Sequence, residues 1–537
     1  MIAAAKMKSL CRPYWDEVVS REPVARLWRR DHTLWKPSSV EIANRLGWLD
    51  LPVSMRSAAA DLEQFAAQAV ERGFRDVVLL GMGGSSLCAE VLRLAFPPRE
   101  GFPKLHVLDS TVPAAVARVS QAADLAHTLF LVSSKSGGTI EVMSNYRYFK
   151  ERVRELKGTA PGSHFVAITD EGTSLVKLAE AEGFWRTFIN PSDLGGRYSV
   201  LSFFGLVPAA LIGVEVGEFL ASSRQMARLC GVEAPLEENP GAWLGLVAGC
   251  LARAGRDKLT IITSPALGGF GLWAEQLVAE STGKEGRGIV PIALEPFGPP
   301  EAYGADRLFA YVRLRNDDNE ACDRHAQALN DAGFPVIAGE LKKPSDLAGE
   351  FFRWEFAIAL AGACLGVNPF DQPNVEESKK NTKTVLEGYE KSHALPALRD
   401  EGNFSEFVQS ARPGDYLALM VFADETPELR EAFEALRRRL LLERRLPTTL
   451  GYGPRFLHST GQLHKGGAGN GLFVQFTAEP EADIAIPGAP YGFGTLAAAQ
   501  AIGDLQSLRM HQRRAIRVHV GKGQSLAARV RSLLVQT

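Results

Sequence analysis

The chain has 537 residues, 46% of them hydrophobic and 23% charged, which is typical of globular proteins. Its length predicts roughly two to four domains. The 60 basic residues against 62 acidic ones leave a net charge of −2. No overall field therefore attracts nucleic acid or an anionic membrane surface, and a small-molecule partner is expected.

Cysteine usage and hydropathy predict a cytoplasmic protein. The six cysteines are scattered without a C-x-x-C pair, which is typical of reduced core thiols. The first residues lack an apolar core of signal-peptide length, and no stretch approaches the roughly 20 apolar residues of a membrane span. We expect neither a membrane nor a nucleic-acid partner. The basic stretch RMHQRRAIRVHVGKG lacks interleaved aromatic residues and is predicted to be a solvated helix and edge strand.

The predicted elements begin with a helical N-terminal segment over residues 1–70, where apolar residues recur at helical spacing. The pattern then changes over residues 71–230, where short apolar runs alternate with helical patterns. Four such runs are followed by helices: RDVVLLGMGG, KLHVLDS, HTLFLVSSKSGG and HFVAITD. Four strand–helix pairs in a row predict an α/β unit with a parallel sheet covered by helices.

A polar, Pro- and Gly-containing stretch at 231–243 marks a boundary, after which the alternation resumes over residues 240–394. Its strand candidates are DKLTIITSP, GIVPIALEP, RLFAYVRLR and FPVIAGEL, and DLAGEFFRWEFAIALAGACLG is predicted to be a long buried helix. A smaller C-terminal α/β segment over residues 395–537 has strand candidates in DYLALMVFAD, GLFVQFTAE and RAIRVHV. The first two α/β units look like a loose duplication by element order.

Two loops that directly follow predicted strands are candidates for binding an anion. GMGGSS (81–86) lets the backbone approach a ligand and opens a helix, and SSKSGGT (133–139) repeats this arrangement with added hydroxyl groups. Both loops lie at the carboxyl ends of strands, where ligands bind in parallel sheets, so a phosphate site is favoured over simple tight packing. A dinucleotide site is disfavoured, because the third spaced glycine is missing and the acidic residue, Asp109, comes late. A nucleotide P-loop lacks its Gly-Lys-Ser/Thr.

The order of five blocks gives a specific resemblance. GMGGSSL, SSKSGGT, NPSDLGGRYSVLSFFGL, AESTGK and NPFDQPNVEESKK span residues 81 to 380. They are similar to successive blocks of the phosphoglucose isomerase family, which is built from two sugar-isomerase (SIS-type) domains. Within the family, the chain most resembles the isomerase half of fused transaldolase–phosphoglucose isomerases. The barrel of the other half is not found in this sequence, which makes a separate transaldolase a candidate partner.

The resemblance implies a fold and a reaction. The fold is α/β, with two SIS-type doubly wound parallel-sheet domains, the smaller C-terminal α/β segment and the helical N-terminal segment. The reaction interconverts glucose 6-phosphate and fructose 6-phosphate by proton transfer through a cis-enediol(ate), with no metal and no cofactor. The family also implies a homodimer whose sites lie at the subunit interface, with a histidine lent across it.

Residue roles follow where the blocks match. Glu280 in AESTGK is the implied base, and Arg197 in Gly-Gly-Arg lies beside the reacting carbons. Gln372 and Lys379 are implied to touch the substrate hydroxyls. The residues implied to cradle the sugar phosphate are Gly84, Ser85, Ser134, Ser136 and Thr139. These types suit the chemistry, because a carboxylate can carry a proton between adjacent carbons and an arginine stays cationic beside a developing oxyanion. Taken alone, Glu280 would instead be interpreted as a solvated helix-end acid.

The family's ring-opening histidine departs from its usual place between the glutamate and lysine blocks. Only His325 lies there, in EACDRHAQAL, which is predicted to be a surface helix; Cys322 and His325 have the spacing of half a metal site without a second half. The matching His-Ser-x-Gly-Gln block comes later, as HSTGQLH at 458–464. His458 is therefore the candidate, with His464 and Lys465 as its nearest rivals.

Two other functions remain open at this point. A related aldose–ketose phosphate isomerase could also accept mannose 6-phosphate. A regulator could bind a sugar phosphate without catalysis, and the displaced histidine is the sequence feature that favours it. Glu280, Arg197 and Lys379 together argue against a regulator, since binding needs the phosphate loops but not a proton shuttle.

Overall fold

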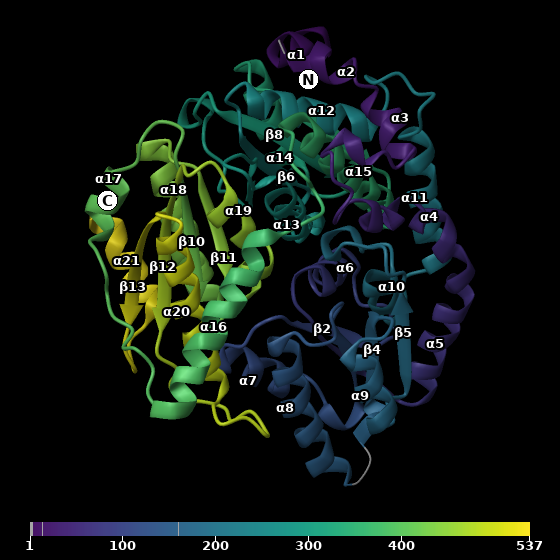
Figure 1. Cartoon of the computed structure of the whole chain (residues 1–537), viewed down its shortest axis with the longest axis vertical. Coiled ribbons are helices and arrows are strands. Elements are labelled where there is room, and N and C mark those ends of the chain that lie inside the picture. The colour runs from purple at the N-terminus through teal and green to yellow at the C-terminus, as the bar shows by residue number, and fades with distance from the viewer. Residues whose placement is uncertain (1–3, 13, 159–160, 537) are drawn as a thin grey trace.

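Three parallel β-sheets organise the chain, and helices pack around each of them (Figure 1). The computed structural model describes residues 4–12, 14–158 and 161–536. The strand orders are β2-β1-β3-β4-β5, β7-β6-β8-β9 and β11-β10-β12-β13. In each sheet, the strands that come second and third along the chain lie on either side of the first one. This is the doubly wound order, in which ligands bind in a crevice at the carboxyl ends of the strands. The predicted α/β class with doubly wound parallel sheets is confirmed.

The first sheet is covered on both faces, because every residue of its three central strands is buried. The four predicted strands are present, and a fifth, unpredicted strand forms one edge. That strand has the sequence RTFIN, in which no continuous apolar run marks it. The strands are β1 (Asp76–Leu80), β2 (Lys104–Leu108), β3 (Thr128–Ser133), β4 (Phe165–Asp170) and β5 (Arg186–Asn190). The helices that follow are α6 (Leu87–Ala95), α7 (Pro113–Ala122), α8 (Ile140–Lys157), α9 (Ser174–Glu182), α10 (Phe203–Leu211) and α11 (Val216–Leu229).

The second sheet packs around a helix whose 19 residues are all buried. This is α15 (Leu347–Leu365), the long buried helix that the sequence predicts, and three other helices lie against it: α11, α12 and α13. All four predicted strands are found: β6 (Lys258–Thr263), β7 (Val290–Ala293), β8 (Arg307–Leu314) and β9 (Val336–Leu341). The other helices of this part are α12 (Pro240–Arg253), α13 (Phe270–Thr282), α14 (Glu320–Asp331) and α16 (Pro373–Ser392).

The third sheet repeats the strand order of the second, so the likeness predicted for the first two units extends to a third. The three predicted strands are present, and the missed one, TTLGY, has neither an apolar run nor strict alternation. The strands are β10 (Tyr416–Phe422), β11 (Thr448–Tyr452), β12 (Gly471–Ala478) and β13 (Arg514–Val520). The helices are α17 (Phe404–Gln409), α18 (Pro427–Arg444), α19 (Gly461–Gly466), α20 (Phe493–Met510) and α21 (Leu526–Gln536). Helix α16 leaves the second unit and packs against α20 (Figure 1).

The start of the chain is helical, as predicted, and it is shared between two units. Its first helices pack against α12 of the second unit, and its last helix packs against α10 and α11 of the first. The helices before residue 71 therefore pack on both of the first two units. The helices are α1 (Ala4–Cys11), α2 (Tyr14–Val19), α3 (Pro23–Trp28), α4 (Leu51–Ser54) and α5 (Ala59–Glu71).

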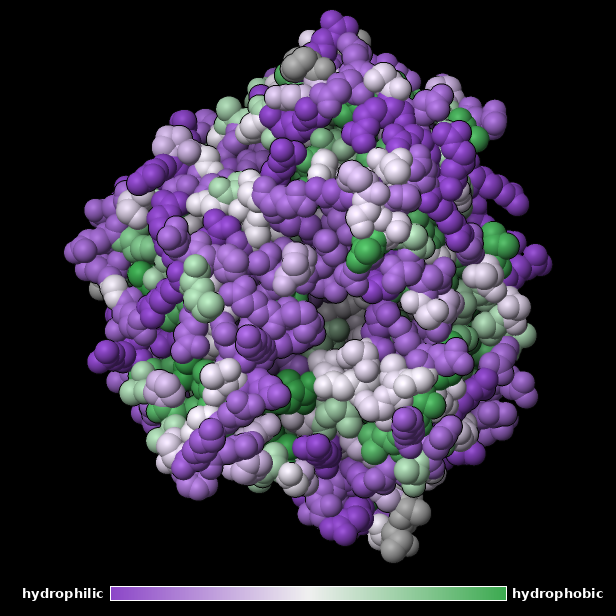
Figure 2. Space-filling view, viewed as in Figure 1, coloured by the Kyte–Doolittle hydropathy of each residue, from purple (hydrophilic) through white to green (hydrophobic). Residues whose placement is uncertain are grey.

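Ion pairs join the third unit, the part of the chain around the third sheet, to the first unit around the first sheet. Arg455, in the short 3₁₀ helix η12 (Arg455–His458), forms a bidentate pair with Asp109, through hydrogen bonds of 2.7 and 3.0 Å. Asp109, whose position disfavoured a dinucleotide site in the sequence, is 3% exposed. A second pair joins Arg118 to Asp424, at 2.9 Å. Figure 2 shows a hollow near the middle of a mostly hydrophilic face, where the three units adjoin in Figure 1.

We predict that Asp109→Ala destabilises the protein by about 2 kcal/mol, because it removes both short hydrogen bonds of the Arg455 guanidinium and leaves only its longer pair with Glu425, at 3.8 Å. Urea denaturation followed by circular dichroism measures the change. The control is Glu155→Ala, which removes an exposed pair with Arg152 and should leave the transition in place. Identical transitions for both variants would show that the buried pair does not fasten the units.

Candidate active site

The two predicted phosphate loops meet at one edge of the first sheet. The loop 81–86 follows β1 and the loop 133–139 follows β3, and these strands are hydrogen-bonded neighbours. Ser134 is buried and its hydroxyl lies 2.9 Å from that of Thr139, whereas Ser136 is exposed. Ser85 is also buried, within the 3₁₀ helix η5 (Gly83–Ser85). The Ser133 hydroxyl donates to the Ser85 carbonyl oxygen at 3.0 Å, so the two loops contact each other at the crevice of the sheet.

The glycines of the first loop make room for two other segments of the chain. Gly83 has φ of 54°, and a Cβ there would lie 2.7 Å from the carbonyl oxygen of His458. A Cβ on Gly84 would lie 2.0 Å from the carbonyl oxygen of Gly196. The loop is therefore glycine-rich because the Gly-Gly-Arg segment and η12 both pack closely against it.

Arg197 joins three segments that are far apart in sequence. It lies in η8 (Gly196–Tyr198) and is 2% exposed. Its Nε donates to the Ser281 hydroxyl at 2.8 Å, and Nη1 donates to Gln372 Oε1 at 3.0 Å. Nη2 donates to the carbonyl oxygens of Pro369 and Asp371, at 2.6 and 2.8 Å. The guanidinium is thus fixed in orientation beside the blocks that carry the predicted base and Gln372.

Glu280 is not a solvated helix-end acid. It lies on α13, all of whose residues except Leu272 are buried, and it is 7% exposed itself. Its Oε2 lies 3.6 Å from Arg197 Nη1 and accepts a hydrogen bond of 3.1 Å from Gln276 Nε2. The same Gln276 nitrogen lies 2.7 Å from the His458 carbonyl oxygen. One amide therefore links the carboxylate on α13 to the backbone of η12.

His458 reaches the site of its own chain. Its Nε2 lies 2.9 Å from Oε1 of Glu141, in the first turn of α8. Burial opposes the charged form of Glu141, but the charge and hydrogen bond of His458 outweigh it and hold the pKa of Glu141 below its usual value. Because the ionised carboxylate only accepts hydrogen bonds, His458 Nε2 must carry a hydrogen. Nδ1 is then the nitrogen left to exchange a proton.

The two rivals of His458 are buried residues of α19. The His464 ring lies 5.0 Å from that of Phe473, and burial lowers its pKa well below the usual range. Lys465 is 2% exposed and pairs with Asp504 at 2.8 Å. His458, by contrast, contacts Glu141 of the first unit.

Lys379, like Ser136, is one of the two exposed residues among those predicted for the site. It lies on α16, its side chain is 52% exposed, and it pairs with Glu376 at 2.7 Å. Its charge nevertheless contributes to lowering the pKa of Glu141. Lys379 therefore lies at the open side of the site, in electrostatic reach of the pair formed by Glu141 and His458.

Three residues of the site were missed by the sequence analysis. Glu141 stands two residues after the second phosphate loop, where a carboxylate at the start of a helix is unremarkable. Gln276 lies one turn before Glu280. Lys284, the last residue of AESTGK, donates to the Asn368 carbonyl oxygen at 2.7 Å and pairs with Asp371. Burial, with the nearby charge of Arg197, lowers the pKa of Lys284 to about 7.

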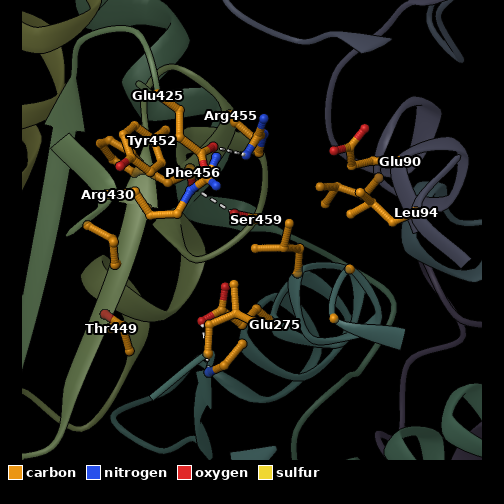
Figure 3. Close-up of a pocket in the computed structure, with 18 of the residues that line it drawn as sticks. Glu90, Leu94, Glu275, Glu425, Arg430, Thr449, Tyr452, Arg455, Phe456 and Ser459 are labelled. Atoms are coloured by element: carbon orange, nitrogen blue, oxygen red, sulfur yellow. Dashed lines mark hydrogen bonds and ion pairs between the residues drawn. The ribbon is translucent and has the colours of Figure 1, made fainter. Parts of the chain in front are cut away.

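A separate cavity of about 980 Å³ lies between the three units (Figure 3). It adjoins η12 through Arg455 and Phe456, but its lining contains none of the ten predicted site residues. Figure 3 shows Glu275 of α13 on one side and Glu90 and Leu94 of α6 on another. Burial raises the pKa of Glu275 to about 7.

His325, predicted to lie on a surface helix, is in fact buried. It is 9% exposed and stacks on Phe297 at 4.2 Å, because α14 turns its apolar face to the second sheet. Within the described ranges, no group of three His, Cys, Asp or Glu residues could hold a metal ion. Over the same residues, we find no helix with the length and apolar character of a membrane span.

Comparison with known proteins gives the family. A family model described as phosphoglucose isomerase matches residues 59–287. The glucose-6-phosphate isomerase of Exiguobacterium sibiricum is 30% identical over 393 residues, which cover 64% of this chain and 86% of that protein. The glucose-6-phosphate isomerase of Parabacteroides distasonis is 30% identical over 404 residues, which cover 66% of this chain and 90% of that protein.

Solved structures agree in fold. A hypothetical protein from Thermus thermophilus is 27% identical, with a TM-score of 0.58 over 70% of this chain and 97% of that one. A glucose-6-phosphate isomerase from Chlamydia trachomatis is similar in fold, with a TM-score of 0.53 and 21% identity over 69% of this chain and 78% of that one. Since one curated relative is 30% identical and aligns over 90% of its length, the chain belongs to the phosphoglucose isomerase family.

Proposed function

We propose that the protein is a glucose-6-phosphate isomerase, which interconverts glucose 6-phosphate and fructose 6-phosphate. The observation that carries the proposal is the buried Glu280 carboxylate, 3.6 Å from the fixed guanidinium of Arg197. A regulator that only bound a sugar phosphate would need the two hydroxyl-bearing loops but not this pair. The name of the Exiguobacterium and Parabacteroides relatives supports the same substrate.

The phosphate group is assigned to the crevice between β1 and β3. Ser85, Ser134, Ser136 and Thr139 supply hydroxyl groups there, and Gly84 lies in the same loop as Ser85. The N-terminus of α8 begins directly after Thr139. Helix N-termini and clustered hydroxyl groups favour a dianion through unpaired N–H and O–H donors.

Ring opening is assigned to His458 and Lys379. In its protonated form His458 gives the Nδ1 proton to the ring oxygen as the bond between that oxygen and C1 breaks, and the neutral imidazole that remains keeps its Nε2 hydrogen on the ionised Glu141. The C1 hydroxyl loses its proton to water as its oxygen becomes the carbonyl oxygen. Lys379 stabilises the negative charge that develops there.

Glu280 then carries the proton between carbons. It removes the C2 proton, the electrons of that bond form the C1–C2 double bond, and the C1 oxygen gains the charge of an enediolate. Arg197 faces this charge with a guanidinium that remains cationic at any working pH. The O2 hydroxyl proton moves to O1, and Glu280 returns its proton to C1, which leaves the ketone at C2.

One chain supplies both the base and the ring-opening group. Gln276 bridges the Glu280 carboxylate and the His458 backbone, so the two residues lie in one site of the same subunit. A homodimer remains compatible with this arrangement, but the site does not need a histidine lent by a partner subunit. Association with a separate transaldolase stays a prediction that co-purification tests.

We predict that Glu280→Gln lowers kcat about 10³-fold with little change in KM, because the amide binds in the same place but cannot carry a proton. A coupled assay of glucose 6-phosphate conversion, with EDTA present, measures the change. Glu275→Gln is the matched control, since it makes the same substitution on the same helix but faces the separate cavity, and it should retain activity. Full activity in Glu280→Gln would overturn the proposed role of this carboxylate.

We also predict that mixing the impaired variants Glu280→Gln and His458→Ala restores no activity beyond the residual activity of each, because each site draws both residues from one chain. The two variants are co-expressed with different tags, and mixed oligomers are isolated with both tags before assay. Recovery of activity in the mixed oligomers would place His458 in a neighbouring subunit's site.

A further inference from the structure

Gln500 connects the third unit to the carboxylate that holds His458. It lies in the middle of α20, and its Nε2 donates to Glu141 Oε1 at 2.8 Å. Its Oε1 accepts a hydrogen bond of 2.6 Å from the hydroxyl of Thr111, which follows β2 in the first unit. Gln500, Glu141 and Thr111 are 2%, 4% and 0% exposed. Water therefore cannot replace any of these contacts without a change in packing.

The orientation of the Gln500 amide follows from its neighbours. Glu141 is ionised and can only accept, so the amide nitrogen must face it. The amide oxygen then faces Thr111, whose hydroxyl must donate. Each polar group has one arrangement available, so a contact from α20 holds the Glu141 carboxylate in place.

Two donors from the third unit converge on one oxygen atom. His458 Nε2 and Gln500 Nε2 lie 2.9 and 2.8 Å from the same Glu141 Oε1. They come from different elements, η12 and α20. We infer that Gln500 is a positioning residue, which acts through Glu141 to set the direction in which His458 presents Nδ1. This inference rests on the proposed function, in which His458 opens the sugar ring.

The physical reason is that a carboxylate with a single donor can rotate about its last side-chain bond. With Gln500 in place, the lone pairs of Oε1 are shared between two fixed donors and the imidazole has one favourable orientation. Without it, the ring follows a mobile acceptor. Misplacement of a reacting group by about 1 Å costs on the order of 100-fold in rate.

The first test is Gln500→Met, which keeps the length of the side chain and removes both hydrogen bonds. We expect kcat for glucose 6-phosphate to fall about 10- to 100-fold with KM within about threefold of wild type. Thr111→Val, which removes only the donor to Gln500, should produce a smaller loss of the same kind. Gln506→Met is the control, because Gln506 is exposed on the same helix, and it should leave kcat unchanged.

A second test separates positioning from simple structural support. Gln500→Met is combined with His458→Ala and compared with His458→Ala alone. If Gln500 acts through His458, the added substitution costs little once the imidazole is absent. If Gln500 only supports the fold, the same loss appears in both backgrounds, and the inference is wrong.

The outcomes also separate this inference from the proposed function. A wild-type protein that does not convert glucose 6-phosphate would overturn the proposed function, and the inference with it. An active wild type whose Gln500→Met variant keeps its full kcat would overturn the inference alone. A melting temperature of Gln500→Met equal to that of wild type, together with the loss of kcat, supports the positioning role.

Discussion

The candidate site depends on the docking of η12 against the carboxyl edge of the first sheet. Two buried carboxylates of the first unit, Asp109 and Glu141, receive Arg455 and His458 from this short helix. A carboxylate buried without a partner costs several kcal/mol, so the first unit is complete only when the third unit lies against it. The docking is also specific in direction, because each carboxylate accepts at defined atoms. The third unit therefore contributes side chains to the candidate site.

The hydrogen bonds to Glu141 also make the stability of this docking depend on pH. The pKa of Glu141 lies below its usual value in the folded protein. Its contribution to stability is therefore complete above the unfolded pKa and is lost as the pH falls through the lowered folded value. At neutral pH the carboxylate is ionised and accepts from His458 Nε2, and Gln276 holds the backbone of η12 beside Glu280. The proton chemistry that we propose would thus rely on hydrogen bonds that also join the units.

Sequence patterns predicted most of the fold but only part of the site. Strands with continuous apolar runs were found, whereas the short strands RTFIN and TTLGY carry no pattern that distinguishes them from loops. The blocks around Arg197 and Glu280 pointed to residues that the structure brings within 3.6 Å of each other. Glu141 and Gln500 could not be predicted as site residues, because they matter only through contacts across units. The two residues are 359 positions apart in the chain. Contacts of this range leave no local periodicity.

The shared strand order of the three sheets explains how a functional block can change its position in the chain. In a doubly wound sheet the segments that follow the strands emerge at one edge, whatever their rank in the sequence. The segment after β11 carries η12, and packing of the third unit points that edge at the loops after β1 and β3. Segments that come in a different order along the chain can thus still meet at one edge of the sheets. An alignment that demands blocks in the same order along the chain would overlook a histidine that the fold brings to the candidate site.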